Sequence, residues 1–197
     1  MTHQLVILLH GVGSNGADMA ALGNAWKGSL AKTLFEAPDA PSHFGAGFAW
    51  FSIDGVTEAN RPQRIEAARA DFDRVITAII DRHGFADKLG QVAFVGFSQG
   101  SIMALDAVAS GRWPVGRVLA YSGRLASPPP LQPSLSTPVL LIHGSTDPVI
   151  PAAETVKAAK ILAALKMQVE SVILPGVGHT ISAEGAERGR RFLAAAP

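Results

Sequence analysis

Five short runs of aliphatic and β-branched residues recur along the chain, with stretches of helical periodicity between most of them. The runs lie at residues 5–9, 92–95, 115–120, 139–142 and 169–174. Apolar runs that do not alternate strictly with polar residues are typical of strands covered on both faces. Strands of this kind form a parallel sheet, because the helices that connect them pack on its faces. The pattern therefore predicts an α/β fold with a mostly parallel sheet and helices on both sides.

The clearest helix is predicted over residues 61–83. Its apolar positions share one face, at Ile65, Ala68, Phe72, Val75, Ile76, Ile79 and Ile80. Asn60 favours a helix start and Gly84 a helix end, because of their capping and backbone preferences. The charged positions of this helix include Arg69 and Asp73, four residues apart, and we interpret them as a solvated face without a function.

Two segments lack a periodic pattern and are predicted to be loops. Residues 127–133 are rich in proline, which lacks the amide donor that a helix or a central strand requires. We interpret this segment as a connector within the domain. Residues 38–60 are rich in glycine and aromatic side chains, and irregular loops of that length in a compact domain are often functional.

Composition narrows the classes of function. The chain has 197 residues, of which 48% are hydrophobic, so we expect a single domain over residues 1–197. A formal net charge of +1 gives no support to a nucleic-acid partner, and the absence of cysteine excludes a thiol nucleophile and a Cys-based zinc site. We find no leader peptide and no apolar span of ~20 residues. We therefore expect a cytoplasmic protein without stable membrane insertion, either a monomer or a homodimer.

A candidate nucleophile, Ser98, lies between the apolar run at residues 92–95 and a helical stretch. Gly96 and Gly100 flank it in a G-x-S-x-G pattern. A serine at such a strand-to-helix turn has a strained backbone that pushes its hydroxyl clear of the sheet, and the small neighbours let the backbones pass. The pattern alone is weak evidence in a chain rich in glycine and serine, so the rest of the sequence has to decide.

A serine hydroxyl is a poor nucleophile unless a general base accepts its proton, and that base needs an acceptor that fixes its tautomer. In α/β hydrolases the residues come in the order Ser, acid, His, each on a loop after a strand. Asp147 lies just past the fourth apolar run, and His179 follows the fifth through a glycine-rich loop. Other acids, such as Asp106, fall in predicted helices, and His143 is interpreted as a structural residue at a strand end. The sequence predicts a triad of Ser98, Asp147 and His179.

The loop after the first apolar run, residues 10–13, is a candidate for stabilising a charged intermediate. Acyl transfer needs backbone N–H donors for an oxyanion, one directly after the nucleophile and one after an early strand. We predict that the amides of Val12 and Gln99 are these donors. The alternative is a phosphate-binding loop, but neither G-x-G-x-x-G nor G-x-x-x-x-G-K-S/T is present, so this alternative is weak.

Taken together, these motifs resemble the phospholipase/carboxylesterase family of serine hydrolases, which includes acyl-protein thioesterases. The resemblance extends over nearly the whole chain and rests on residues 9–13, 96–100, 121–123, 143–144, 147–151 and 178–182. It implies a minimal α/β-hydrolase domain without a lid, and hydrolysis of esters or thioesters with no cofactor and no metal. Trp50 and Phe51 are similar to a Trp-Phe-Asp segment beside the site in this family, but Ser52 stands where aspartate is usual.

Apolar residues near these motifs are candidates for the substrate pocket, namely Met19, Trp50, Phe51 and Val149. The leading hypothesis is a serine carboxylesterase that hydrolyses small, short-acyl carboxylic esters through an acyl-serine. Short acyl groups are favoured because only the proline-rich connector, and no helical cap, is predicted between the third and fourth apolar runs. A thioesterase acting on acyl-proteins or acyl carriers is the alternative, and a non-catalytic binding module on the same fold is a remote one.

Overall fold

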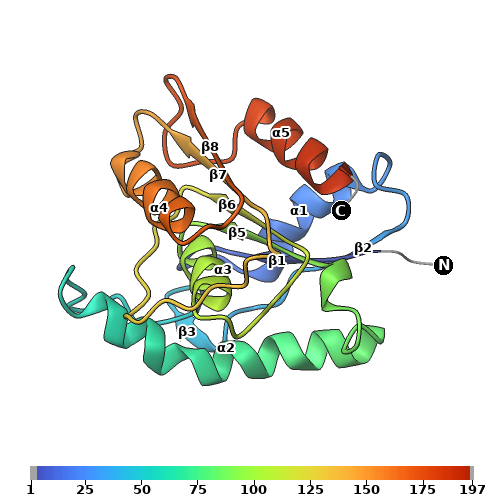
Figure 1. Ribbon diagram of the computed structural model, residues 1–197, viewed down its shortest axis with the longest axis horizontal. Helices are drawn as coiled ribbons and strands as arrows, with labels where there is room; N and C mark the ends of the chain where they lie inside the picture. The colour runs from blue at the N-terminus through green and yellow to red at the C-terminus, as the bar shows by residue number, and fades with distance from the viewer. Residues whose placement is uncertain (1–3, 196–197) are drawn as a thin grey trace.

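A six-stranded parallel sheet forms the centre of the computed structural model, which describes residues 4–195 (Figure 1). Its strand order is β2-β1-β5-β6-β7-β8. The strands are β1 (Gln4–Leu9), β2 (Thr33–Glu36), β5 (Val92–Phe97), β6 (Arg117–Tyr121), β7 (Val139–Gly144) and β8 (Val169–Leu174). The first three residues of the stretch searched for a leader, and the last two of the predicted domain, lie outside the described residues.

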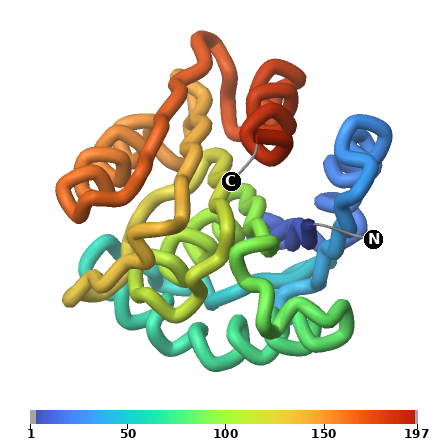
Figure 2. Tube along the Cα trace, turned by 45° about the vertical axis from the view of Figure 1, so that its right-hand side comes forward, coloured from blue at the N-terminus to red at the C-terminus, as the bar shows by residue number. Residues whose placement is uncertain are grey.

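Five helices cover the two faces of this sheet. They are α1 (Gly16–Trp26), α2 (Arg61–His83), α3 (Gln99–Ala109), α4 (Ala153–Ala164) and α5 (Ala183–Ala194), with a short 3-10 turn at Leu89–Gln91. The long α2 lies with α3 on one side of the sheet, and α1 and α5 lie on the other (Figures 1 and 2). The predicted α/β fold with helices on both faces is confirmed.

The strand β1 shows why these strands read as continuous apolar runs. Leu5 and Ile7 pack in a core formed with α2 and α3, whereas Val6 and Leu8 pack in a second core that includes Trp26 of α1. Successive side chains of a strand point to opposite faces, so a sheet covered on both sides needs apolar residues at every position. Each such side chain contributes ~1.5–3 kcal/mol by its burial.

The helix α2 has the bounds that its capping residues predict. Gly84 follows it in the left-handed conformation, with φ of 70°. Glycine adopts this conformation without the steric penalty of a Cβ atom. Asn60 precedes the helix, but its side chain accepts a hydrogen bond from the Thr57 amide and donates one to the Gly55 carbonyl, and so does not cap the helix.

The interpretation of Arg69 and Asp73 as a solvated face was wrong. Arg69 makes two hydrogen bonds, of 2.8 and 3.0 Å, to the fully buried carboxylate of Asp106 on α3. Arg112 bridges the two acids, with nitrogen atoms 2.9 Å from Asp106 and 3.0 Å from Asp73. Burial alone would raise the pKa of Asp106, but hydrogen bonds from Arg69 and Arg112 outweigh it and hold that pKa below its usual value.

The segment at residues 38–60 is more regular than predicted. It contains a short antiparallel hairpin of β3 (Ser42–Phe44) and β4 (Gly47–Ala49), and it follows the unpredicted edge strand β2. These strands have only three or four residues each, which is too short for a periodic pattern. The hairpin is held to the loop after β1, because the amide of Gly13 donates to the carbonyl of Phe48 and the amide of Phe48 donates to the carbonyl of Ser14.

The connector between β6 and β7, residues 122–138, contains no helix or strand, as its proline content predicts. A hydrogen bond from the amide of Gln132 to the carbonyl of Ala109 fixes it to the end of α3.

No helix among residues 4–195 is long and apolar enough to cross a membrane.

Candidate active site

Ser98 lies at the sharp turn between β5 and α3. Its φ of 53° and ψ of −114° put a non-glycine residue in a strained region of backbone conformation. A Cβ atom at Gly96 would lie 2.4 Å from the amide nitrogen of Ser101, and one at Gly100 would lie 2.1 Å from the carbonyl oxygen of Leu9. Only glycine fits at these two positions, so the turn that exposes the serine depends on both of them.

The structure brings Ser98, His179 and Asp147 together from loops that are far apart in the sequence. The Nε2 atom of His179 is 3.0 Å from the Oγ atom of Ser98, and its Nδ1 atom is 2.7 Å from Oδ2 of Asp147. The side chain of His179 is 17% exposed, whereas that of Asp147 is fully buried. A carboxylate can only accept, so Nδ1 of His179 carries a proton and Nε2 is left to accept the proton of the serine.

Hydrogen bonds keep the carboxylate of Asp147 ionised although it is buried. Burial would raise its pKa, but the hydrogen bond from His179 and those from the amides of Ile150 and Val149 lower it below its usual value. These two amides donate to Oδ1 at 2.9 and 2.8 Å, so Oδ2 is free to face the imidazole. The acid is therefore fixed in both position and charge.

A second histidine, His143, also contacts the carboxylate of Asp147. Its Nε2 atom is 3.1 Å from Oδ2 of Asp147 and 2.8 Å from the carbonyl oxygen of Ile150, so this nitrogen is the donor. Its Nδ1 atom lies 2.7 Å from the hydroxyl of Thr155, which then donates to it. Sequence reasoning placed His143 at a strand end but missed this contact, although the four-residue spacing to Asp147 on a strand-to-loop turn was visible.

Val12 and Gln99 line the same cleft as Ser98. Gln99 is the first residue of α3, so its N–H is one of the donors that a helix leaves without an internal partner. Among the described residues, no acceptor lies within hydrogen-bond reach of the Val12 N–H, whereas the amides of Gly13 and Ser14 are both paired. These two donors are therefore free to bind an oxygen atom in the cleft.

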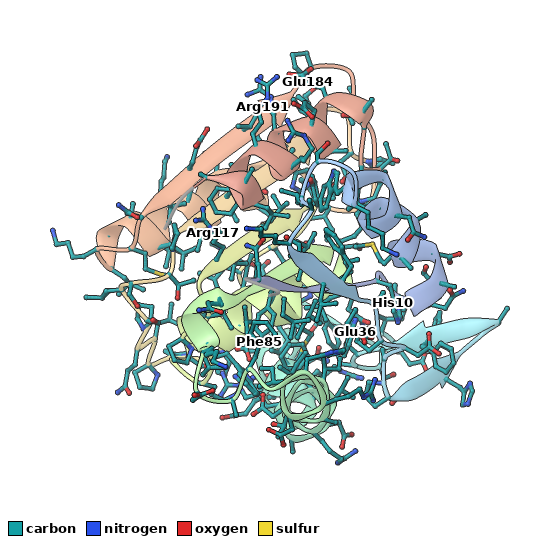
Figure 3. The ribbon with its side chains drawn as sticks, turned by 90° about the vertical axis from the view of Figure 1, so that its right-hand side faces the viewer. His10, Glu36, Phe85, Arg117, Glu184 and Arg191 are labelled. Carbon is teal, nitrogen blue, oxygen red and sulfur yellow. The ribbon has the colours of Figure 1, made fainter. Side chains whose placement is uncertain are left out.

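His10, labelled in Figure 3, has a buried side chain that holds the loop carrying Val12. Its Nε2 atom accepts a hydrogen bond of 2.9 Å from the amide of Ala40, so Nδ1 carries the proton and donates to the carbonyl of Gly11 at 2.7 Å. Burial lowers the pKa of His10 and outweighs that hydrogen bond, which favours the neutral ring. The two hydrogen bonds of His10 thus fix the conformation of this loop.

Two of the four predicted pocket residues do not reach the cleft. Trp50 is 2% exposed, donates from Nε1 to the carbonyl of His10 at 3.0 Å and packs against Phe72. Met19 lies in the core beneath α1, on the other face of the sheet. Neither residue lines the cleft, because an apolar residue near a motif in the sequence can equally well be a core residue.

Phe51 and Val149 do line the cleft, which has a volume of about 240 Å³. Phe51 is held there because the Gln99 side chain accepts from the amide of Trp50 and donates to the carbonyl of Phe51, both at 2.7 Å. Sequence reasoning missed four further apolar lining residues, Ile53, Val56, Ile102 and Ile150, and two cations, Arg61 and Arg124. Ile53 and Val56 belong to the long loop that was predicted to be functional.

No cluster of three or more metal-ligating side chains, from histidine, cysteine, aspartate or glutamate, occurs in the described part of the chain.

The sequence matches a family model over residues 1–196, and the description of that model is phospholipase/carboxylesterase. The chain belongs to this family.

Individual proteins are also similar to this chain over most of its length. Esterase YpfH of Escherichia coli K12 is 36% identical over 181 residues, which cover 90% of this chain and 76% of the relative. Acyl-protein thioesterase 1 of Gibberella zeae is 26% identical, over 95% of this chain and 88% of the relative. The crystal structure of esterase PE8 superposes with a TM-score of 0.89 at 34% identity, covering 98% of this chain and 92% of that one. The predicted family, fold and enzyme class, a hydrolase, are confirmed.

Proposed function

We propose that this family member is a serine carboxylesterase that hydrolyses small, short-acyl carboxylic esters through an acyl-enzyme on Ser98. The observation that carries the proposal is the chain of contacts from Ser98 to His179 at 3.0 Å and from His179 to Asp147 at 2.7 Å. The site draws its residues from loops after β1, β5, β7 and β8, so the chain acts as one domain. We expect it to work in the cytoplasm as a monomer or homodimer.

In the first half-reaction, Oγ of Ser98 attacks the ester carbonyl carbon while Nε2 of His179 takes the hydroxyl proton. The buried carboxylate of Asp147 stabilises the imidazolium that forms. The carbonyl oxygen becomes an oxyanion between the amides of Val12 and Gln99, and a donor of this kind contributes about 3–4 kcal/mol to the transition state. When the intermediate collapses, the C–O bond to the alcohol breaks and His179 returns the proton to the leaving oxygen.

In the second half-reaction, water takes the place of the alcohol. His179 accepts a proton from the water as its oxygen attacks the acyl carbon, and the oxyanion forms again between the same two amides. Collapse releases the carboxylic acid, and the proton of His179 returns to Oγ of Ser98.

The expected substrate is short because the cleft is small and uncovered. Its volume of about 240 Å³ is below the ~300–1,000 Å³ of sites for drug-sized ligands. Each buried methylene contributes ~0.8 kcal/mol, so catalytic efficiency should rise only while further methylenes still enter the cleft. With p-nitrophenyl esters, kcat/KM should climb from acetyl to butyryl or hexanoyl and then level off or fall.

A thioesterase is the second candidate, because several relatives of 26–28% identity are acyl-protein thioesterases. The same serine, histidine and amides would serve both reactions. Matched oxygen esters and thioesters with one acyl group would separate the two activities, and a preference for palmitoyl thioesters would favour the second candidate.

The test of the proposal is the ester panel applied to Ser98→Ala and His179→Ala. Each variant should lose kcat by several orders of magnitude, and the double variant should be little worse, because the residues act as a unit. The control is Ser29→Ala, an exposed serine of the loop after α1, which should keep its activity. Near-wild-type turnover by Ser98→Ala would end the assignment, and a steady rise to palmitoyl esters would refute the short-acyl part.

A further inference from the structure

Two arginines, Arg61 and Arg124, line the cleft that holds Ser98. Apart from them, from Ser98 and from Gln99, all of the lining side chains are apolar. The same two arginines also line a smaller, polar pocket next to the cleft, with Glu58, Glu154 and Lys157. The guanidinium groups therefore stand at the boundary between an apolar cleft and a charged one.

The charges of these arginines are poorly compensated within the protein. No carboxylate of the described residues lies within 4.0 Å of the half-buried Arg61, and Arg124 has one contact of 3.7 Å with Glu154. The side chain of Arg124 is only 16% exposed. Burial, together with the positive charge of Arg124, lowers the pKa of Arg61, although a guanidinium stays charged at any working pH.

Other part-buried arginines of the chain have hydrogen-bond acceptors within the protein, and Arg117 donates to the carbonyls of Phe192 and Ala195. Arg69 holds both carboxylate oxygens of Asp106, and Arg112 is hydrogen bonded to Asp106 and Asp73. These arginines stabilise the scaffold and have no donor directed at the substrate cleft. Because a planar guanidinium is suited to bind a carboxylate with two hydrogen bonds, a cation beside the nucleophile without such a partner points to an external anion.

We propose that Arg61 and Arg124 form a subsite for a carboxylate carried by the substrate, so that the preferred ester has a negative charge on its acyl part or on its alcohol part. This inference rests on the proposed function. Together with Glu58, Glu154 and Lys157 of the adjoining pocket, the two arginines leave one net positive charge at this wall of the cleft, which one carboxylate would neutralise. The apolar residues beside Ser98, such as Val149 and Ile150, would contact the carbon chain between the ester and the carboxylate.

The test uses pairs of esters that differ only in charge. On the acyl side, p-nitrophenyl monoesters of succinic, glutaric and adipic acid are compared with the corresponding monoamides, and spontaneous hydrolysis is subtracted. On the alcohol side, 4-butyryloxybenzoate is compared with its benzamide. We expect kcat/KM to favour the carboxylate by at least about tenfold in one of the two series, which also shows the side of the ester that carries the charge.

The variants Arg61→Met and Arg124→Met should bring this ratio of carboxylate to amide close to one, whatever their overall activity. Arg61→Lys should keep part of the preference, because it retains the charge but loses the planar pair of donors. The control is Arg188→Met, an exposed arginine of α5, which should leave the ratio unchanged. Equal efficiency on acid and amide in the wild type would overturn the subsite, and so would an unchanged ratio in both methionine variants.

Binding separates failure of the subsite from failure of the proposed chemistry. In Ser98→Ala, which cannot form the acyl-enzyme, the charged ester of the series that shows the preference should bind at least about tenfold more tightly than its amide, and Arg61→Met should remove this difference. If Ser98 is not the nucleophile, the proposed function is refuted, but this difference in affinity should persist. If the two ligands bind equally in Ser98→Ala, the subsite is refuted and the esterase proposal stands.

Discussion

Two fully buried carboxylates, Asp106 and Asp147, show how differently one chemical group is used in this molecule. Both are hydrogen bonded and both have a pKa below the usual value in spite of burial. Asp106, on α3, is held by the permanent cations Arg69 and Arg112. Asp147, in the loop after β7, faces the imidazole of His179, which can gain or lose a proton.

The difference lies in the partner and in the position within the fold, and not in burial or ionisation. A carboxylate held by arginines cannot take part in proton transfer, because a guanidinium does not release its proton. A carboxylate at the end of a parallel strand, beside a histidine, can stabilise the imidazolium that forms when a serine is deprotonated. We therefore expect Asp106 to matter for stability and Asp147 to matter for catalysis.

The largest effect is expected for Asp147→Asn. An amide can keep the hydrogen bonds from Val149 and Ile150 but can hold the wrong tautomer of His179, so kcat should fall by ~10⁴-fold. Stability should change less than in Asp106→Asn, because the neighbouring histidines leave no permanent charge unpaired. Steady-state kinetics and urea unfolding measure the two quantities. An Asp147→Asn variant with normal kcat would break the comparison.

Asp106→Asn should show the opposite behaviour. Removing one member of a buried ion pair leaves Arg69 without its carboxylate, so the free energy of unfolding should drop by about 3–5 kcal/mol. The folded fraction should keep kcat close to that of the wild type. The matched control is Asp71→Asn, a half-exposed acid of α2, with a change within about 0.5 kcal/mol. Equal stabilities of the two variants would refute a structural role for Asp106.

A smaller effect is expected in the dependence of stability on acid. Because the pKa of Asp106 is lower in the folded protein than its unfolded value of about 3.9, its contribution is complete above that pH and is lost as the pH falls further. The free energy of unfolding of the wild type should therefore decrease below about pH 4. In Asp106→Asn this decrease should be shallower, and an identical slope in both proteins would show that Asp106 does not titrate as proposed.

The same contrast explains what the sequence could predict. Each of the three residues of the proposed triad follows a signal of strand and loop, and those signals are local. The C-terminal end of the helix at residues 61–83 was also predictable, because Gly84 readily adopts the left-handed backbone at which a helix ends. Position relative to a strand end is likewise a local property, so the sequence itself distinguishes Asp147 from Asp106.

Contacts between distant segments could not be predicted in this way. Arg69 and Asp106 are 37 residues apart, and helical periodicity carries no information about which helix packs opposite. For the same reason Trp50 was interpreted as a pocket residue, although it is buried against His10, and Arg61 was not seen to lie in the cleft. Core and pocket differ in three-dimensional packing, not in residue type.

The most direct test of the account is the rate at which a fluorophosphonate labels the protein, followed by intact-mass and peptide mass spectrometry. The wild type should gain one label, on Ser98, and Ser98→Ala should gain none. Labelling should slow by more than about 10³-fold in Asp147→Asn, whereas folded Asp106→Asn should react at the wild-type rate. Labelling at another residue, or equal rates in the two aspartate variants, would contradict the claim that Ser98 is activated through His179 and Asp147.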